Sequence, residues 1–178
     1  MATRRQPKKL DRDGLWEYAL KLLGQRPYAM ADLRRKLAGR AEGASDVPAV
    51  LAKLKEYGLV NDQKFSETFA SSRLQNQGFG RFRVIRELRV KRVAPKVAEE
   101  AVNKVFAGTE EKELIEQFLA RKYRGKDLAE FLREEKNLAS VYRRLRTAGF
   151  TSGGSFAVLK RYARQVEEWE EGEEEQGS

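Results

Sequence analysis

The chain has 178 residues, a formal net charge of +9, and neither cysteine nor histidine. Without those two residue types it can form no disulfide, no thiolate zinc site, no catalytic thiol and no Ser-His-Asp triad. Its acidic residues show no metal-binding spacing, and it contains neither a phosphate-binding loop nor a Gly-rich dinucleotide fingerprint, so we expect no cofactor and no enzyme.

The apolar residues give no sign of a membrane segment. No apolar run approaches the roughly 18–20 residues that cross a bilayer. The basic residues 1–12 are followed by no apolar signal-peptide segment. We therefore expect a cytoplasmic protein that makes no membrane contact.

Positive charge is unevenly distributed along the chain. Residues 166–178 hold seven glutamates and no Lys or Arg, so residues 1–165 carry a net charge of +16. We predict a basic disordered arm at residues 1–12 and an acidic disordered tail at residues 170–178. The tail has two interpretations: it folds onto basic side chains and competes with DNA, or it only keeps the chain soluble.

Ten amphipathic helices are predicted from apolar residues that recur at helical spacing. Asp13 is expected to cap the first helix, Pro48 to begin the third, Asn61 or Asp62 to cap the fourth, and glycines to end most of them. No segment alternates apolar and polar residues as a strand does, so the fold class is all-α. The helices are expected at about residues 13–24, 30–39, 48–58, 62–78, 81–92, 95–107, 109–124, 127–132, 138–148 and 151–169.

Two distant segments resemble each other and suggest an internal repeat. In residues 58–65 and in residues 149–156, a Phe follows a Gly by seven positions, with a large apolar residue and a capping-type residue between them. Three-helix units of this size gain stability by stacking on their neighbours. We predict an elongated tandem array of three three-helix repeats, at residues 13–60, 61–107 and 108–150, with an extra C-terminal helix at residues 151–169.

The most basic stretch follows Gly78-Phe79-Gly80. Residues 81–96 hold seven Lys or Arg and one acid. Phe82, Ile85 and Leu88 recur every three residues, which predicts a buried stripe, and Arg83, Arg86 and Arg89 form a second stripe about 100° away. This helix is either a solvated surface or a docking surface for nucleic acid or an acidic protein groove. Phe82 is expected in the core, which leaves Phe79 as the candidate for stacking on a base.

Three segments of the chain resemble the RecX regulatory proteins, the modulators of the RecA recombinase. The resemblance covers roughly residues 13–165. It rests on Tyr18-Ala19-Leu20-Lys21-Leu22-Leu23 through Leu33-Arg34-Arg35-Lys36-Leu37, on Leu51 to Asp62 with Phe65, Phe69, Ala70 and Arg73, and on Gly78-Phe79-Gly80-Arg81 through Ile85, Glu87-Leu88 and Lys91. The Glu-rich tail has no counterpart in the family pattern.

The resemblance implies tandem three-helix repeats and a regulatory, non-enzymatic role. RecX-like proteins bind in the groove of RecA filaments on single-stranded DNA, and they limit filament growth, ATP hydrolysis, strand exchange and the co-protease activity of the SOS response. The implied partners are the RecA filament and, weakly, single- and double-stranded DNA, and we expect a monomer. The competing hypothesis is a RecA-independent DNA-binding module that acts through its basic helices.

Basic side chains in each predicted repeat are the candidate contacts, because the Arg fork can pair bidentately with carboxylates or phosphates. A weaker set, Arg34, Arg35 and Lys36, lies in the first repeat. The predicted partner- and DNA-binding residues are Arg81, Arg83, Arg86, Arg89, Lys91, Arg92, Arg121, Lys122, Arg124, Lys126, Arg143, Arg144, Arg146, Lys160, Arg161 and Arg164.

Overall fold

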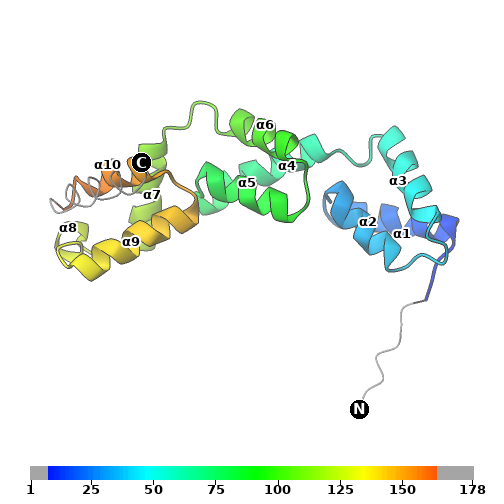
Figure 1. The fold of residues 1–178 in the computed structure, drawn as a ribbon, viewed down its shortest axis with the longest axis horizontal. Coiled ribbons are helices and arrows are strands. Elements are labelled where there is room, and N and C mark those ends of the chain that lie inside the picture. Colours follow the sequence, from blue (N-terminus) through cyan, green and yellow to red (C-terminus); the bar gives the residue numbers. More distant parts are fainter. Residues whose placement is uncertain (1–7, 164–178) are drawn as a thin grey trace, which may run out of the picture. The chain divides into compact units, whose positions relative to one another are not determined.

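The computed structural model describes residues 8–163 and shows an all-α chain (Figure 1). Its helices are α1 Arg12–Gln25, α2 Met30–Ala38, α3 Asp46–Glu56, α4 Asp62–Ser72, α5 Arg81–Val90, α6 Pro95–Val105, α7 Glu111–Lys122, α8 Leu128–Phe131, α9 Glu135–Ala148 and α10 Ser152–Leu159. A π-helical turn at Arg73–Gln77 follows α4. Within the described residues, the one extended pairing is an isolated bridge, so the predicted all-α fold class is confirmed.

That bridge corrects the prediction for the N-terminal arm. Leu10 pairs with Ala41, and its amide donates to the Arg40 carbonyl at 2.7 Å. Residues 10–12 therefore belong to the fold, because α1 already begins at Arg12. The rest of the predicted arm before Lys8, the acidic tail and Arg164 lie outside the described residues.

The chain divides into two compact units, and both units take residues from the predicted second repeat. Among the described residues, the first comprises residues 8–69 and 87–101, and the second comprises residues 70–86 and 102–163. Because the division passes through α4, α5 and α6, the boundaries of the three repeats stay a prediction.

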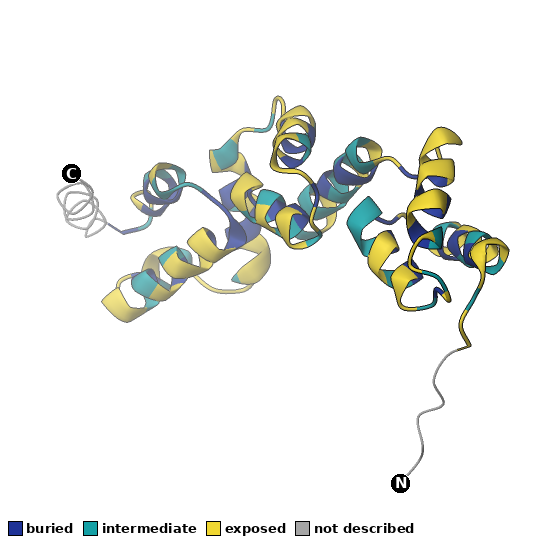
Figure 2. Ribbon diagram, turned by 45° about the vertical axis from the view of Figure 1, so that its right-hand side comes forward, coloured by how far each residue is buried: buried dark blue, intermediate teal, exposed yellow. Residues whose placement is uncertain are grey.

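In the first unit, α1, α2 and α3 pack around a core of aliphatic side chains. Leu15, Leu33, Leu37 and Leu54 are fully buried there, and the buried face of each helix is dark blue in Figure 2. The side chain of Asp11 caps α1 by accepting from the Gly14 amide at 2.9 Å, so the prediction of Asp13 as the cap is wrong.

Two neighbouring residues, Asn61 and Asp62, lie at the start of α4. Asn61 caps this helix, accepting from the Lys64 amide at 2.9 Å. Asp62 instead accepts from the amide of Met30, the first residue of α2, at 2.8 Å. Since the first amides of a helix have no partner within it, Asp62 supplies α2 with a partner from a different helix of the same unit.

In the second unit, α7, α9 and α10 pack together around aromatic and aliphatic side chains. Ile115, Leu138 and Leu145 are fully buried, and the ring of Phe118 meets Phe150 edge-on at 5.5 Å between centroids. The tenth helix ends at Leu159, short of its predicted end, and the chain continues as a turn to Tyr162.

The two segments that resemble each other differ by one residue in their structure. Gly58 and Gly149 both adopt the left-handed conformation at a helix end, with φ of 66° and 93°. The cap that follows comes three residues later at Asn61 but two residues later at Thr151. Phe65 and Phe156 therefore do not occupy equivalent positions, although both are buried.

Candidate functional site

The basic helix α5 buries a different stripe from the predicted one. Val84 and Leu88 are fully buried, Ile85 is half-buried, and Phe82 is 57% exposed. The buried stripe therefore follows a spacing of four residues, starting at Gly80, rather than the spacing of three counted from Phe82. The prediction that Phe82 lies in the core is wrong.

Phe79 is also placed differently from its predicted role. Its ring is half-buried and lies under the guanidinium of Arg83, 3.6 Å from the Arg83 Cζ to the ring centroid. A cation over an aromatic face is attracted by the ring quadrupole. Arg83 thus covers Phe79, whereas the ring of Phe82 is exposed.

The start of α5 is joined to the end of α9. The amides of Gly80 and Phe82 donate to the carbonyls of Ala148 and Gly149 at 2.9 and 3.2 Å. The Arg86 Nη2 donates to the Thr147 carbonyl at 3.2 Å. The unpaired amides of one helix thus bind the unpaired carbonyls of another, and Arg86 contributes to this junction.

Other predicted contacts in the second unit are also held by the protein itself. Arg81 donates to the side chain of Asn103, and Arg121 to the carbonyl of Gln77. Arg146 Nη1 donates to the Phe150 carbonyl at 2.7 Å, and Arg161 pairs with Glu116. These arginines order helix ends and loops, a role that sequence reasoning did not separate from ligand binding.

Several of the remaining cations lie over aromatic rings. Lys126 lies 4.2 Å from the Phe131 ring centroid, Arg144 lies 5.7 Å from that of Tyr123, and Lys122 lies 5.9 Å from that of Phe118. In each contact the charged group lies near the ring face, while the residue as a whole remains exposed. Lys160 is exposed and has a partner within the protein.

In the first unit, the end of α5 carries the other half of the basic helix. Arg89 pairs with Glu99 at 3.1 Å, and both side chains are about half exposed. Lys91 Nζ lies 5.4 Å from the Phe69 ring centroid. In α2, Arg35 pairs with Asp32 at 3.1 Å and Lys36 lies 5.9 Å from the Tyr28 ring centroid.

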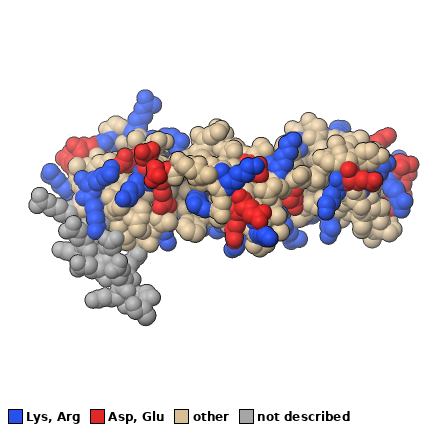
Figure 3. Space-filling model, turned by 90° about the horizontal axis from the view of Figure 1, so that it is seen from above, with Lys and Arg blue, Asp and Glu red and all other residues tan. Residues whose placement is uncertain are grey.

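The candidates that remain available are exposed and have no side-chain partner among residues 8–163. They are Arg34, Arg92, Arg124 and Arg143. Figure 3 shows basic side chains interspersed with acidic ones on the visible face, without one continuous basic patch. The candidates without a described side-chain partner are thus separate from one another, with Arg34 and Arg92 in the first unit and Arg124 and Arg143 in the second.

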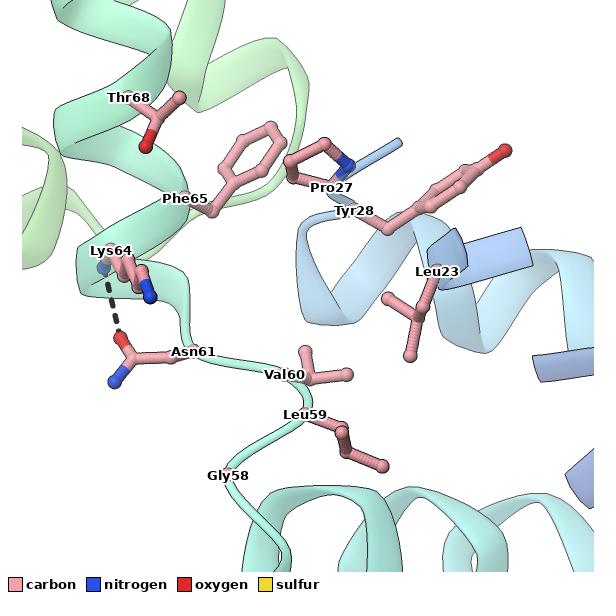
Figure 4. Close-up of a pocket in the computed structure, with 10 residues that line it drawn as sticks. All are labelled: Leu23, Pro27, Tyr28, Gly58, Leu59, Val60, Asn61, Lys64, Phe65 and Thr68. Carbon is pink, nitrogen blue, oxygen red and sulfur yellow. Dashed lines mark hydrogen bonds between the residues drawn. The ribbon is translucent and has the colours of Figure 1, made fainter. Parts of the chain in front are cut away.

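A hollow that sequence reasoning missed lies in the first unit and has a volume of about 220 Å³. Figure 4 shows its lining, which comes from the end of α1, the link between α3 and α4, and the first turns of α4. Leu59, 45% exposed, lies on its rim, and Lys64 supplies a charge. Because its walls come from segments at least 30 residues apart, no local pattern predicts it.

Neither a metal-binding cluster nor a membrane-spanning helix is found among the described residues. Within them, no three His, Cys, Asp or Glu side chains converge to hold a metal ion. Over the same residues, every helix is too short or too polar to cross a bilayer. What the described residues present is a set of exposed basic side chains, with Arg34 and Arg143 on helices and Arg92 and Arg124 in turns.

Comparison with known proteins identifies the family. A regulatory protein RecX from Trichlorobacter lovleyi is 30% identical over 134 residues, which cover 75% of this chain and 86% of that protein. The chain belongs to the RecX family of regulatory proteins. A RecX protein from Syntrophotalea carbinolica is 26% identical over 151 residues, covering 85% of this chain and 95% of the relative.

The family model and the solved structures agree with this assignment. The model of the second three-helix domain of RecX matches residues 61–102, which include all of α4 and α5. The crystal structure of RecX from Lactobacillus salivarius superposes with a TM-score of 0.66 at 16% identity, covering 85% of this chain and 96% of that chain. Another RecX crystal structure gives the same TM-score at 19% identity, covering 84% and 71%. At these identities the structures establish a shared fold, and the basic helix lies in the second RecX domain.

Proposed function

We propose that this protein inhibits the RecA recombinase by binding in the groove of RecA filaments on single-stranded DNA. Bound there, it limits filament growth, ATP hydrolysis and strand exchange in recombination and DNA repair. The observation that carries the proposal is membership of the RecX family in a chain that has exposed arginines without a side-chain partner among residues 8–163, located on α2, in the turn after α5, in the turn after α7, and on α9.

Several separate contacts suit a filament better than a single small ligand. A RecA–DNA filament is a repeating anionic lattice, so one chain with several basic helices can contact more than one position on it. Contacts made by one molecule add through their effective concentration, even where each is weak alone. Regulation by binding requires no catalytic group, and we propose that the protein acts as a cytoplasmic monomer without a cofactor.

The proposal is tested by titrating the protein into RecA that hydrolyses ATP on single-stranded DNA. Inhibition at ratios far below one protein per RecA subunit is the expected result, because a block at one point of a filament affects many subunits. The alternative, a RecA-independent DNA-binding module, predicts inhibition only when the protein suffices to cover the DNA, and loss of that inhibition with excess DNA. That outcome would overturn the proposed function.

A pair of matched triple variants tests whether the unpaired arginines carry the binding. The variant R92A/R124A/R143A should need about ten times more protein for half-maximal inhibition, since three exposed ion pairs of about 0.5 kcal/mol each correspond to roughly tenfold in affinity. The control K21A/K55A/K112A removes the same charge from exposed lysines. An equal loss in both variants would mean that only net charge matters.

A further inference from the structure

The first unit contains a small basic hollow between α2 and the end of α5. It has a volume of about 190 Å³ and is lined by Ala31, Asp32 and Arg35 of α2 together with Val90, Lys91 and Arg92. Val90 is 79% exposed. The hollow therefore combines three cations with an uncovered apolar surface.

Arg92 has a backbone conformation that glycine normally supplies. Its φ is +60°, and every other positive-φ residue among those described is a glycine: Gly58, Gly78, Gly108, Gly125 and Gly149. A side chain with a Cβ is strained in this left-handed region, and Arg lacks the short polar side chain with which Asn or Asp relieves the strain.

The helix end itself does not require an arginine. The Arg92 amide donates to the Arg89 carbonyl at 2.8 Å, and the Val93 amide donates to the Leu88 carbonyl at 3.2 Å. Both bonds come from the backbone, so a glycine would make them as well. The helix end needs the left-handed conformation but not an arginine in it. A strained residue of this kind points to a role of its side chain, so the Arg92 guanidinium is the group to explain.

The charges around the hollow favour an anionic ligand. Arg35 forms an ion pair with Asp32 at 3.1 Å. Lys91 forms no ion pair with a carboxylate among the described residues. Arg92 is exposed and has no described side-chain partner. Three cations and one carboxylate leave the hollow with a local charge of about +2, attractive to phosphates one nucleotide apart.

We propose that this hollow binds the phosphodiester backbone of single-stranded DNA, and that Arg92 occupies a strained conformation for that purpose. The exposed methyl groups of Val90 can contact a sugar or an unpaired base. Duplex DNA keeps its bases stacked and paired, so a single strand suits this contact better. The inference deepens the proposed function and rests on it for the identity of the polymer. It singles out Arg92 as a DNA contact among the arginines of this segment, which the sequence pattern could not tell apart.

The substitution Arg92→Gly separates the two effects of this residue. We expect its melting temperature to rise by about 2–4 °C, because the left-handed strain is removed. Its affinity for single-stranded oligonucleotide, measured without RecA at low salt, should fall about three- to fivefold, since one exposed charge pair is lost. The plot of log affinity against log salt should become shallower by about 0.7, as one phosphate contact on a single strand predicts.

Basic residues at a helix C-terminus also stabilise the helix dipole, and the same variant distinguishes this explanation. If Arg92 served only the helix end, Arg92→Gly would lower the melting temperature and leave oligonucleotide affinity unchanged. Arg92→Lys keeps the charge and the strained backbone, so it should retain the wild-type melting temperature and most of the affinity. Loss of affinity in the Lys variant equal to that in the Gly variant would contradict a contact based on charge.

A matched control and a second readout complete the test. Lys55→Gln removes one charge from an exposed position on α3, and an affinity loss equal to that of Arg92→Gly would reduce the effect to net charge and overturn the subsite. If Arg92→Gly binds oligonucleotide normally but inhibits RecA less, the hollow binds an acidic protein surface instead of DNA. If the wild-type protein binds oligonucleotide through Arg92 but does not inhibit RecA, the proposed function fails and the subsite stands.

Discussion

Gly80 and Gly149 approach each other so closely that neither can carry a side chain. A Cβ built on Gly80 would lie closer than 3 Å to the Gly149 carbonyl oxygen, and one built on Gly149 would lie equally close to the Arg83 amide nitrogen. Gly149 also has a φ of +93°. The glycine before the basic helix thus serves packing, in addition to opening the helix.

The substitution Gly80→Ala tests this contact. The added methyl group meets backbone, which cannot rotate away, so we expect a loss of about 1–3 kcal/mol of unfolding free energy. Urea denaturation followed by circular dichroism measures the change. The control is Gly24→Ala in α1, where a Cβ meets no atom within 4 Å; it should gain about 0.5–1 kcal/mol from the lower chain entropy of alanine. Equal stabilities of the Gly80 variant and the wild type would show that the helix ends can separate without loss.

Single residues also show where sequence reasoning reaches its limit. A spacing of three residues fits the stripe Phe82, Ile85 and Leu88, whereas a spacing of four from Gly80 fits Val84 and Leu88, so the sequence could not decide whether Phe82 or Val84 faces the core. The structure buries Val84 and Leu88 because Gly80, one turn earlier, lies against α9. That contact joins Gly80 to Ala148, 68 positions later in the chain, which a local pattern cannot contain.

At the scale of the helix, ends were more predictable than partners. The glycines at positions 58, 78 and 149 end helices in the left-handed conformation, as their residue type predicts. Asp11 caps α1 in place of the predicted Asp13, directly after Leu10, which pairs with Ala41. Asn61 is the cap of α4, as expected. Its neighbour Asp62 instead accepts from the first amide of α2, because the fold brings that unpaired amide within hydrogen-bond distance.

The start of α10 depends on a carboxylate from another helix. Thr151 caps α10, accepting from the Gly154 amide at 2.9 Å. Glu111, the first residue of α7, accepts in turn from the Thr151 amide at 2.9 Å and from its hydroxyl. A negative charge near a helix N-terminus is favourable, so Glu111 stabilises α10 and joins it to α7.

We therefore predict that Glu111→Ala destabilises the second unit. It leaves the half-buried Thr151 amide without its acceptor and removes the charge, which together should lower the unfolding free energy by about 1–3 kcal/mol. Thermal and urea denaturation measure this loss. Glu113→Ala, two residues later and exposed, should change stability by less than about 0.5 kcal/mol. Similar losses in the two variants would assign the effect to the helix dipole of α7 and not to the contact with Thr151.

At the scale of the whole molecule, the fold class and the family can be predicted from the sequence, because they depend on patterns that recur from helix to helix. Apolar spacing predicts helices throughout, and the order of three helical segments carries the family resemblance. The candidate site can be predicted less completely from the sequence. Arg86, Arg121 and Arg146 donate to backbone carbonyls that come within reach only in the folded chain. A sequence shows that an arginine is present on a helix face but not which oxygen lies within its reach.

Net charge belongs to this largest scale, and it supplies the last prediction. A chain ending at Gln165 lacks the seven glutamates of residues 166–178, so its net charge rises from +9 to +16. We expect it to bind single-stranded DNA more tightly than the full chain at low salt, and we expect the difference to shrink as salt screens the charges. Fluorescence anisotropy between about 0.05 and 0.3 M salt measures both effects, where the Debye length falls from roughly 14 to 6 Å. A full-length chain with the seven glutamates changed to glutamine should match the shortened one, because charge and not length is responsible. Equal affinities of all three chains at low salt would leave the tail with a solubilising role alone.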